Sequence, residues 1–147
     1  MSGIFRKSLF IILLFNFISQ TGWSQVTGLW KTIGDVDGKE KSIVEIYEQG
    51  GKLFGKVVKI LPASAYTICE HCSGELKNKP ITGMVILKDL TKTPDGGEDG
   101  TVMDPGSGKV YSCYIKLESP DKLKLRGYIG VRAIGRTQYW YRVKSLE

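Results

Sequence analysis

The sequence has little of the chemistry on which enzymes and metal sites depend. Its 147 residues include one histidine and three cysteines. The histidine lies inside a cysteine-containing segment and no serine occupies a nucleophile elbow, so a hydrolytic triad has little support. No glycine-rich phosphate loop precedes a helix. We therefore expect no catalytic residues, no enzymatic activity and no resident cofactor.

Long apolar runs are also missing, apart from one near the N-terminus. Residues 9–18 are apolar at all but one position, and this run is about half the length that spans a bilayer. It follows Arg6 and Lys7 and precedes small and polar residues, which is the pattern of a secretory signal peptide. The pattern predicts that residues 1–24 are removed by cleavage near Gln25.

Cysteine is absent before Cys69, which excludes a lipid-modified cysteine at the predicted cleavage site. We therefore expect an exported protein, periplasmic or extracellular, that keeps no stable membrane anchor. Residues 25–147 hold 19 Lys and Arg against 15 Asp and Glu, a net charge of +4. These charges are spread along the chain and do not form a clustered basic face, so we expect no nucleic-acid partner.

Helical periodicity is almost absent from residues 25–147. Eight short runs rich in β-branched and aromatic residues alternate with Gly, Asp, Asn and Pro, which is typical of strands and turns. The predicted strands are residues 26–33, 42–48, 52–61, 83–90, 100–103, 109–117, 122–130 and 135–143. Residues 91–97 are predicted to form a polar turn between the fourth and fifth strands.

This order of strands predicts a single all-β domain over residues 25–147. Strands so short bury their apolar faces only if the sheet packs on itself or closes. Eight antiparallel strands with mostly short connections favour a closed up-and-down barrel, which has no exposed edges and leaves room for packed side chains or one small ligand. A two-sheet sandwich is the alternative, but it usually needs longer crossing connections.

Alternation assigns the faces of two of these strands. The sixth places Cys113 and Ile115 on the core face. The seventh places Ile129 on the core face and Tyr128 on the solvent face. One face of the last strand carries two arginines, an amide and an indole, namely Arg136, Gln138, Trp140 and Arg142. Parity alone leaves open whether that face points inward.

Four segments carry a resemblance to a known family. They are residues 77–84, 104–113, 123–128 and 135–142, which read KNKPITGM, DPGSGKVYSC, LKLRGY and GRTQYWYR. They resemble domain-of-unknown-function family 2147 and keep its order of motifs over nearly the whole of residues 25–147. The resemblance implies a bacterial protein exported to the cell envelope with a lipocalin-like barrel, and it implies no assigned activity.

A second resemblance concerns Gly28 and Trp30 on the first predicted strand and Arg142 on the last. They resemble the pattern of the calycins, in which a Gly-x-Trp indole closes one end of the barrel beneath a cation from the final strand. An arginine plane over an indole gains cation–π and dispersion energy. The pattern therefore favours a calycin/lipocalin-like barrel, with Trp30 either purely structural or also in contact with a ligand.

Residues 62–80 form a long segment without periodicity that contains Cys69, His71 and Cys72. A loop of this length is unusual in a compact domain unless it is functional or cross-linked. In an oxidising compartment the simplest interpretation is a Cys69–Cys72 disulfide, which leaves Cys113 as a small buried residue. The alternatives are a metal site, a redox site, and a disulfide between Cys113 and one loop cysteine.

The candidate ligand-binding residues are cationic, aromatic or amide side chains, namely Arg126, Arg136, Gln138, Trp140, Arg142 and Trp30. If the Arg136 face of the last strand points inward, its cations need partners, which suits an anionic or amphipathic ligand or internal carboxylates. If it points outward, it forms a basic aromatic patch for a protein or an envelope surface.

We therefore favour a binding module for a small hydrophobic or anionic ligand. One alternative is a structural or protein-interaction module of the cell envelope, whose barrel is filled by its own side chains. A less favoured alternative is a metal or redox protein that uses Cys69 and Cys72.

Overall fold

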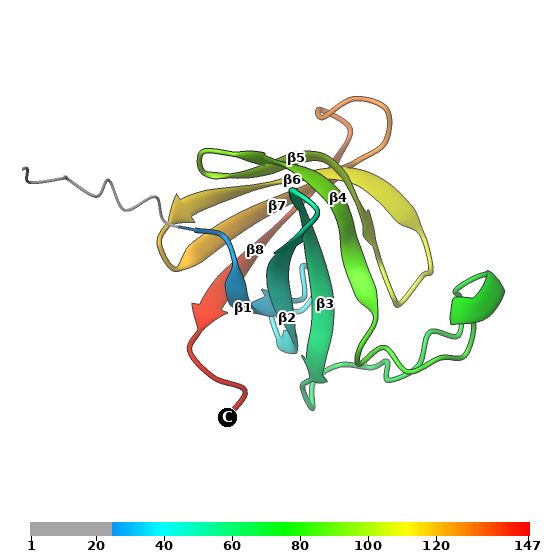
Figure 1. The fold of residues 1–147 in the computed structure, drawn as a ribbon. Coiled ribbons are helices and arrows are strands. Elements are labelled where there is room, and N and C mark those ends of the chain that lie inside the picture. Colours follow the sequence, from blue (N-terminus) through cyan, green and yellow to red (C-terminus); the bar gives the residue numbers. More distant parts are fainter. Residues whose placement is uncertain (1–24) are drawn as a thin grey trace, which may run out of the picture.

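The computed structural model describes residues 25–147. They form eight antiparallel strands that close into a barrel in chain order, with β1 paired to β8 (Figure 1). The strands are β1 Gly28–Ile33, β2 Glu40–Gln49, β3 Lys52–Ile60, β4 Val85–Thr93, β5 Gly96–Met103, β6 Val110–Ser119, β7 Lys122–Tyr128 and β8 Gly135–Val143, and a short 3-10 helix, η1 Gly74–Leu76, lies between β3 and β4. The predicted all-β barrel is confirmed. The predicted signal peptide, residues 1–24, lies outside the described residues.

The strand bounds agree best at the end of the chain and least around the fourth strand. The predicted last strand has the bounds of β8. The predicted polar turn over residues 91–97 is wrong, because β4 continues to Thr93 and β5 begins at Gly96. Thr91 and Lys92 are exposed on β4, so this end of the hairpin has polar side chains although its backbone is fully paired.

The predicted faces hold along β6 and fail at the end of β7. Cys113 and Ile115 are buried, as alternation predicts. Beyond Gly127 the predicted burial is wrong, because Tyr128 keeps its outer face but is only 8% exposed, and Ile129, which alternation places in the core, is 67% exposed. The chain leaves the sheet after Tyr128, whose ring packs at 6.5 Å from that of Tyr114 on the outside of the barrel. The two-residue period of a strand therefore no longer applies there.

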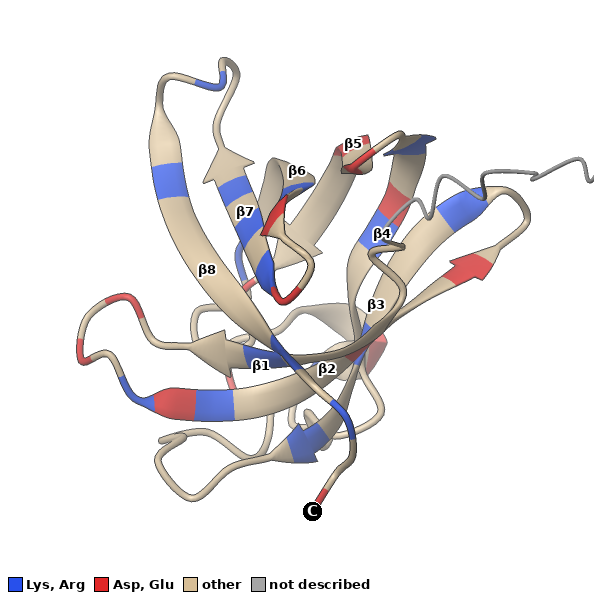
Figure 2. Cartoon of the chain, turned by 90° about the vertical axis from the view of Figure 1, so that its left-hand side faces the viewer, with Lys and Arg blue, Asp and Glu red and all other residues tan. Residues whose placement is uncertain are grey.

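The two ends of the barrel are built differently. At one end the strands are joined by short turns, and the interior is filled by apolar side chains that are almost completely buried, including Trp30, Val44, Ile46, Leu53, Leu90 and Leu123. At the other end lie the longer connections, residues 34–39, 61–84, 104–109 and 129–134. Charged residues of both signs are spread over the outer faces of the strands (Figure 2). Within residues 25–147 we find no helix long and apolar enough to cross a bilayer.

Candidate ligand-binding cavity

The short-turn end of the barrel is sealed by Arg142 and Trp30. The Arg142 guanidinium carbon lies 4.3 Å from the centroid of the Trp30 ring. Its Nη1 and Nη2 donate hydrogen bonds to the carbonyls of Thr27 and Gln25, at 3.0 and 2.7 Å. Gly28 permits this approach, because a Cβ there would lie 2.9 Å from Arg142 Nη1 and its φ of +125° disfavours other residues. The predicted calycin closure is confirmed.

The long-loop end of the barrel holds a cavity of about 750 Å³ that opens between the loops. Its inner wall is mainly aliphatic and aromatic, with side chains from five strands and from the loop before β4. These are Val57, Ile60, Ile81, Ile86, Val102, Leu125 and Trp140. Trp140 is 2% exposed and points inward, which settles the orientation of β8. The face that carries Gln138 and Trp140 is therefore the inner one.

A few polar groups interrupt this apolar wall. Trp140 Nε1 donates a hydrogen bond to Gln138 Oε1 at 3.2 Å. This bond fixes the amide oxygen on Trp140 and leaves the amide nitrogen for a different partner. Among the described residues the Gln138 amide nitrogen has no assigned acceptor. The hydroxyls of Thr32 and Ser42 lie 2.8 Å apart and share one hydrogen bond. The wall therefore offers neutral hydrogen-bonding groups and no charge.

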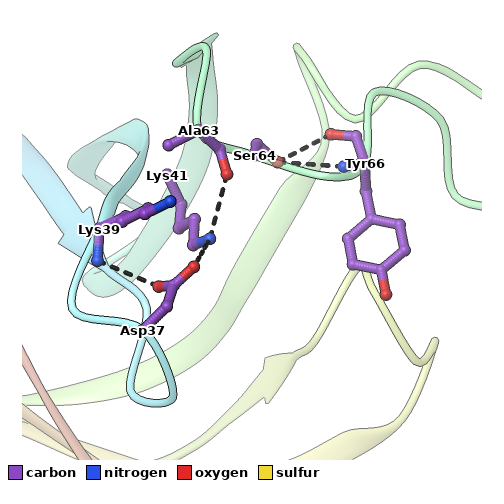
Figure 3. Close-up of polar contacts among 6 residues, drawn as sticks. All are labelled: Asp37, Lys39, Lys41, Ala63, Ser64 and Tyr66. Carbon is purple, nitrogen blue, oxygen red and sulfur yellow. Dashed lines mark hydrogen bonds and ion pairs between the residues drawn. The ribbon is translucent and has the colours of Figure 1, made fainter.

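Charged residues lie at the rim, where Lys41 joins two loops (Figure 3). Its Nζ donates to Asp37 Oδ2 at 2.6 Å and to the carbonyl of Ala63 at 3.1 Å. Asp37 Oδ1 also accepts a hydrogen bond from the backbone amide of Lys39. The Lys41 hydrogen bond, followed by that of Lys39, lowers the pKa of Asp37 below its ordinary value of 3.8. The ion pair thus ties the β1–β2 loop to the chain that follows β3.

Three further contacts complete the rim. Ser64 Oγ donates to the carbonyl of Tyr66 at 3.0 Å (Figure 3). The ring of Tyr66 packs on the β5–β6 loop at Gly106, where a Cβ would lie 2.9 Å from Tyr66 Cε2. On the other side, Arg136 of β8 forms an ion pair with Asp35 of the β1–β2 loop at 2.8 Å. The opening is therefore surrounded by contacts that join the β1–β2 loop to β8 and to the chain after β3, and that chain to the β5–β6 loop.

Comparison with known proteins agrees with this architecture. The family model described as "Uncharacterized protein conserved in bacteria (DUF2147)" matches residues 28–142, from the Gly-x-Trp segment to the arginine above it. The chain belongs to this family. The resemblance of the four sequence segments is thereby confirmed.

A solved structure shares the fold of this DUF2147 protein. It is protein HP1028 from the human pathogen Helicobacter pylori, described as belonging to the lipocalin family. The two chains are 22% identical, with a TM-score of 0.72 over 82% of this chain and 84% of that chain. At this identity the likeness shows a common lipocalin-like barrel and nothing about the ligand. No curated protein matches the sequence.

The DUF2147 barrel brings only three of the six candidate ligand-binding residues to the cavity. Arg136, Gln138 and Trp140 line it. Trp30 and Arg142 form the seal at the opposite end. The sixth candidate is on the outer surface. Arg126 Nη1 donates to Thr137 Oγ1, and its other two nitrogens donate to carbonyls of the β7–β8 loop.

Sequence reasoning missed cavity residues on the first two strands. Thr32 is largely buried and its hydroxyl pairs with Ser42 in the wall. Thr32 lies two residues after Trp30, so the two-residue period of a strand places both side chains on one face. That signal was present in the sequence, whereas the pairing of Thr32 with Ser42 follows from the β1–β2 register.

The predicted disulfide between Cys69 and Cys72 is present in the DUF2147 barrel, with Cα atoms 5.4 Å apart. Cys69 Sγ lies 3.3 Å from the carbonyl oxygen of Pro105, and Cys72 Sγ lies 3.6 Å from Met103 Sδ. The disulfide therefore packs the long loop against the β5–β6 side of the opening. Cys113 is buried in the barrel, and burial raises the pKa of its thiol to about 12.

Proposed function

We propose that this DUF2147 barrel binds a small apolar molecule inside the cavity, with any polar end of the ligand at the rim. The observation that carries the proposal is the cavity of about 750 Å³, since pockets for small molecules span about 300–1,000 Å³. The Trp30–Arg142 seal closes the other end, which leaves the loop end as the way in. A lipocalin-like fold is also consistent with binding, which is an argument from fold alone.

The arrangement of charge favours an uncharged ligand over an anionic one. The charged side chains that line the opening are Asp35, Asp37, Asp104, Lys41 and Arg136, which together carry one net negative charge. Arg136 and Lys41 are both paired with aspartates of the β1–β2 loop. An anion entering the cavity would have to displace one of these carboxylates, whereas a neutral apolar molecule would not.

Two fluorescent probes with the same ring system test this preference. N-phenyl-1-naphthylamine is neutral, and 8-anilinonaphthalene-1-sulfonate adds a sulfonate to it. We expect the neutral probe to bind at least about tenfold more tightly, because no unpaired cation meets the sulfonate. Energy transfer from Trp30 and Trp140 to the probe would report binding to the barrel, and the cavity-filling variant described next locates it. Tighter binding of the sulfonate would support an anionic ligand instead.

A cavity-filling variant identifies the site. Gly127 lines the cavity, and a Cβ there would meet Val102 and Tyr111 only at 3.6 and 3.8 Å. Gly127→Leu should therefore occupy the cavity without disturbing the backbone, and it should abolish probe binding. The control Ser112→Leu adds the same side chain to the exposed face of β6 and should leave binding unchanged. Unchanged binding by folded Gly127→Leu would show that the probe binds elsewhere.

The proposal includes export, with function in the periplasm or outside the cell. Three observations support it: the signal-peptide pattern of residues 1–24, the Cys69–Cys72 disulfide, and membership of a family conserved in bacteria. Mass spectrometry of protein expressed with its own N-terminus should show cleavage near Gln25 and a loss of about two daltons for the disulfide. An intact N-terminus would contradict export by this route.

A further inference from the structure

The β7–β8 loop carries an apolar tip that ligand binding alone does not explain. Ile129, Val131 and Ile134 are 67%, 57% and 64% exposed. Figure 1 shows this loop, in orange, standing out beyond the ends of the strands. Clustered aliphatic side chains on a protruding loop are costly to leave in water and mark a site of interaction. We call these three residues the apolar tip.

Cationic residues lead up to the apolar tip along the outside of the barrel. From residue 122 to residue 144 the sequence has seven Lys and Arg and no Asp or Glu. Lys122, Lys124 and Arg126 alternate along the outer face of β7, where Figure 2 shows blue bands. Among the described residues none of these three forms an ion pair with a carboxylate. The Lys122 ammonium lies 4.5 Å from the ring centroid of Tyr139, which is itself exposed.

The loop is held in shape by residues outside its apex. Arg126 Nε and Nη2 donate to the carbonyls of Arg132 and Ala133, at 3.0 and 3.1 Å. The Arg132 side chain turns back onto the barrel wall, where it contacts Glu98 at 3.3 Å and lies 4.7 Å from the Tyr114 ring centroid. The one cation of the loop is thus directed away from the apex, which leaves the exposed apex aliphatic.

We propose that the β7–β8 hairpin docks on an anionic lipid bilayer. The apolar tip inserts among the lipid headgroups, and the two cations of β7 nearest to it, Arg126 and then Lys124, lie closest to their phosphates, whereas Lys122 lies at the sealed end of the barrel. This is the pattern by which peripheral proteins bind membranes, with shallow apolar insertion added to attraction between basic residues and anionic lipid. Ile129 and Ile134 also line the cavity opening. Docking therefore places the opening at the bilayer, where an apolar ligand can pass without crossing water.

The size and shape of the apolar tip favour a bilayer over a protein partner. A stable protein interface buries about 800 Å² on each partner over a complementary surface. Three aliphatic side chains on one narrow loop provide much less area than that. Lipids can pack around a narrow loop, and the anionic surface adds attraction to the cationic row. The same comparison disfavours a second copy of the chain as the occupant.

The test is co-sedimentation with lipid vesicles. The protein is expressed from its full sequence and purified after export. Vesicles of phosphatidylglycerol and phosphatidylethanolamine should bind the protein, and phosphatidylcholine vesicles should bind it weakly. Ile134→Ser should lower the partition coefficient about fivefold, because it removes one inserted aliphatic side chain. The control Leu76→Ser removes an exposed aliphatic side chain from η1, far from the tip in Figure 1. It should change partitioning less than about twofold.

A charge-removal variant tests the cation nearest the tip that holds no loop carbonyl. Lys124→Gln should weaken the preference for anionic vesicles. Lys88→Gln removes one charge from an exposed position on β4 and should retain it. All variants share one N-terminus, checked by mass spectrometry, so residues 1–24 cannot cause a difference between them.

Three results would decide against the proposal. In the first, the wild-type protein binds neither kind of vesicle. In the second, Ile134→Ser partitions into vesicles as well as the wild type does. In the third, the protein does not bind vesicles but associates with itself, and Ile134→Ser abolishes that association. The last would assign the apolar tip to a second copy of the chain. Gly127→Leu should bind vesicles as the wild type does. Membrane docking and ligand binding therefore succeed or fail independently.

Discussion

The filled half and the hollow half of the barrel share the same eight strands, and they differ in the size of the side chains that point inward. On β7 the inward residues run from Leu123 through Leu125 to Gly127, from the sealed end towards the opening. On β1 they run from Trp30 to Thr32. Closure of the sheet fixes the diameter of the barrel, so smaller inward residues leave space that neighbouring strands do not fill.

The contacts that hold the two ends also differ in kind. At the sealed end, the Arg142 guanidinium donates to three backbone carbonyls and covers the Trp30 ring. At the opening, the loops are joined by exposed ion pairs such as Arg136–Asp35. Exposed pairs contribute little to stability, whereas a guanidinium that donates to several carbonyls and covers a buried ring contributes more. Stability is therefore concentrated at the end of the barrel opposite the cavity.

The largest expected effect concerns the thiol of Cys113 in the packed interior. Burial raises its pKa from 9.0 to about 12, so its thiolate at pH 8 is about 1,000-fold scarcer than that of an exposed cysteine. We expect a thiol reagent such as dithionitrobenzoate to leave the native protein unmodified. After unfolding without reductant, one thiol per chain should react. Rapid modification of the native protein would mean that water reaches the buried interior around Cys113.

Two leucines on one strand compare the packing of the two halves directly. Leu123 is fully buried in the filled half, and Leu125 lines the cavity. Leu123→Ala should lower the free energy of unfolding by about 3–4 kcal/mol, because it leaves a new cavity among packed neighbours. Leu125→Ala should cost about 1–2 kcal/mol, since one side of Leu125 already faces empty space. Urea unfolding measures the loss of unfolding free energy in each variant. Equal losses would contradict empty space beside Leu125 in the hollow half.

Two arginines on the inner face of β8 compare the contacts at the two ends. Arg142→Ala removes the cover of Trp30 and leaves carbonyls without donors, which should cost about 2 kcal/mol. Arg136→Ala removes one exposed ion pair and should cost less than about 0.5 kcal/mol. Arg142→Lys keeps the charge but not the planar fork, so it should recover only part of the loss. Thermal unfolding of the three variants gives the order, and a larger loss for Arg136→Ala would reverse the comparison.

Much of the filled half could be predicted from the sequence, because its signals are local. The alternation of β6 identifies Cys113 and Ile115 as core residues, and the Gly28–Trp30 pattern marks the seal beneath Arg142. The bounds of β8 follow from a segment that contains three consecutive aromatic residues, Tyr139 to Tyr141, with β-branched Thr137 and Val143 on either side. Each of these inferences needs only neighbouring residues or the order of the strands.

The hollow half could not be predicted in the same way. A cavity depends on the summed volume of inward side chains from all strands, and that sum requires the register between them. The Arg136–Asp35 contact joins the first connection of the barrel to its last strand, which no local pattern links. Arg126 is different, because alternation along β7 places it on the outer face with Lys124, opposite Leu123 and Leu125. Its inclusion among the ligand-binding candidates went against the strand's own period.

The smallest expected effect is a pH dependence confined to the rim. The Lys41 hydrogen bond holds the pKa of Asp37 below its ordinary value of 3.8 in the folded protein. A carboxylate with a lowered pKa stabilises the fold above its unfolded pKa, and that stabilisation is lost as pH falls through the folded value. Asp37→Asn should therefore lower the urea midpoint slightly at pH 7 and match the wild type near pH 2. Because the pair is exposed, the shift should be smaller than that of either leucine variant. A difference that persisted in acid would mean that the Asn side chain disturbs the β1–β2 loop itself, and that the charge of Asp37 does not hold the rim.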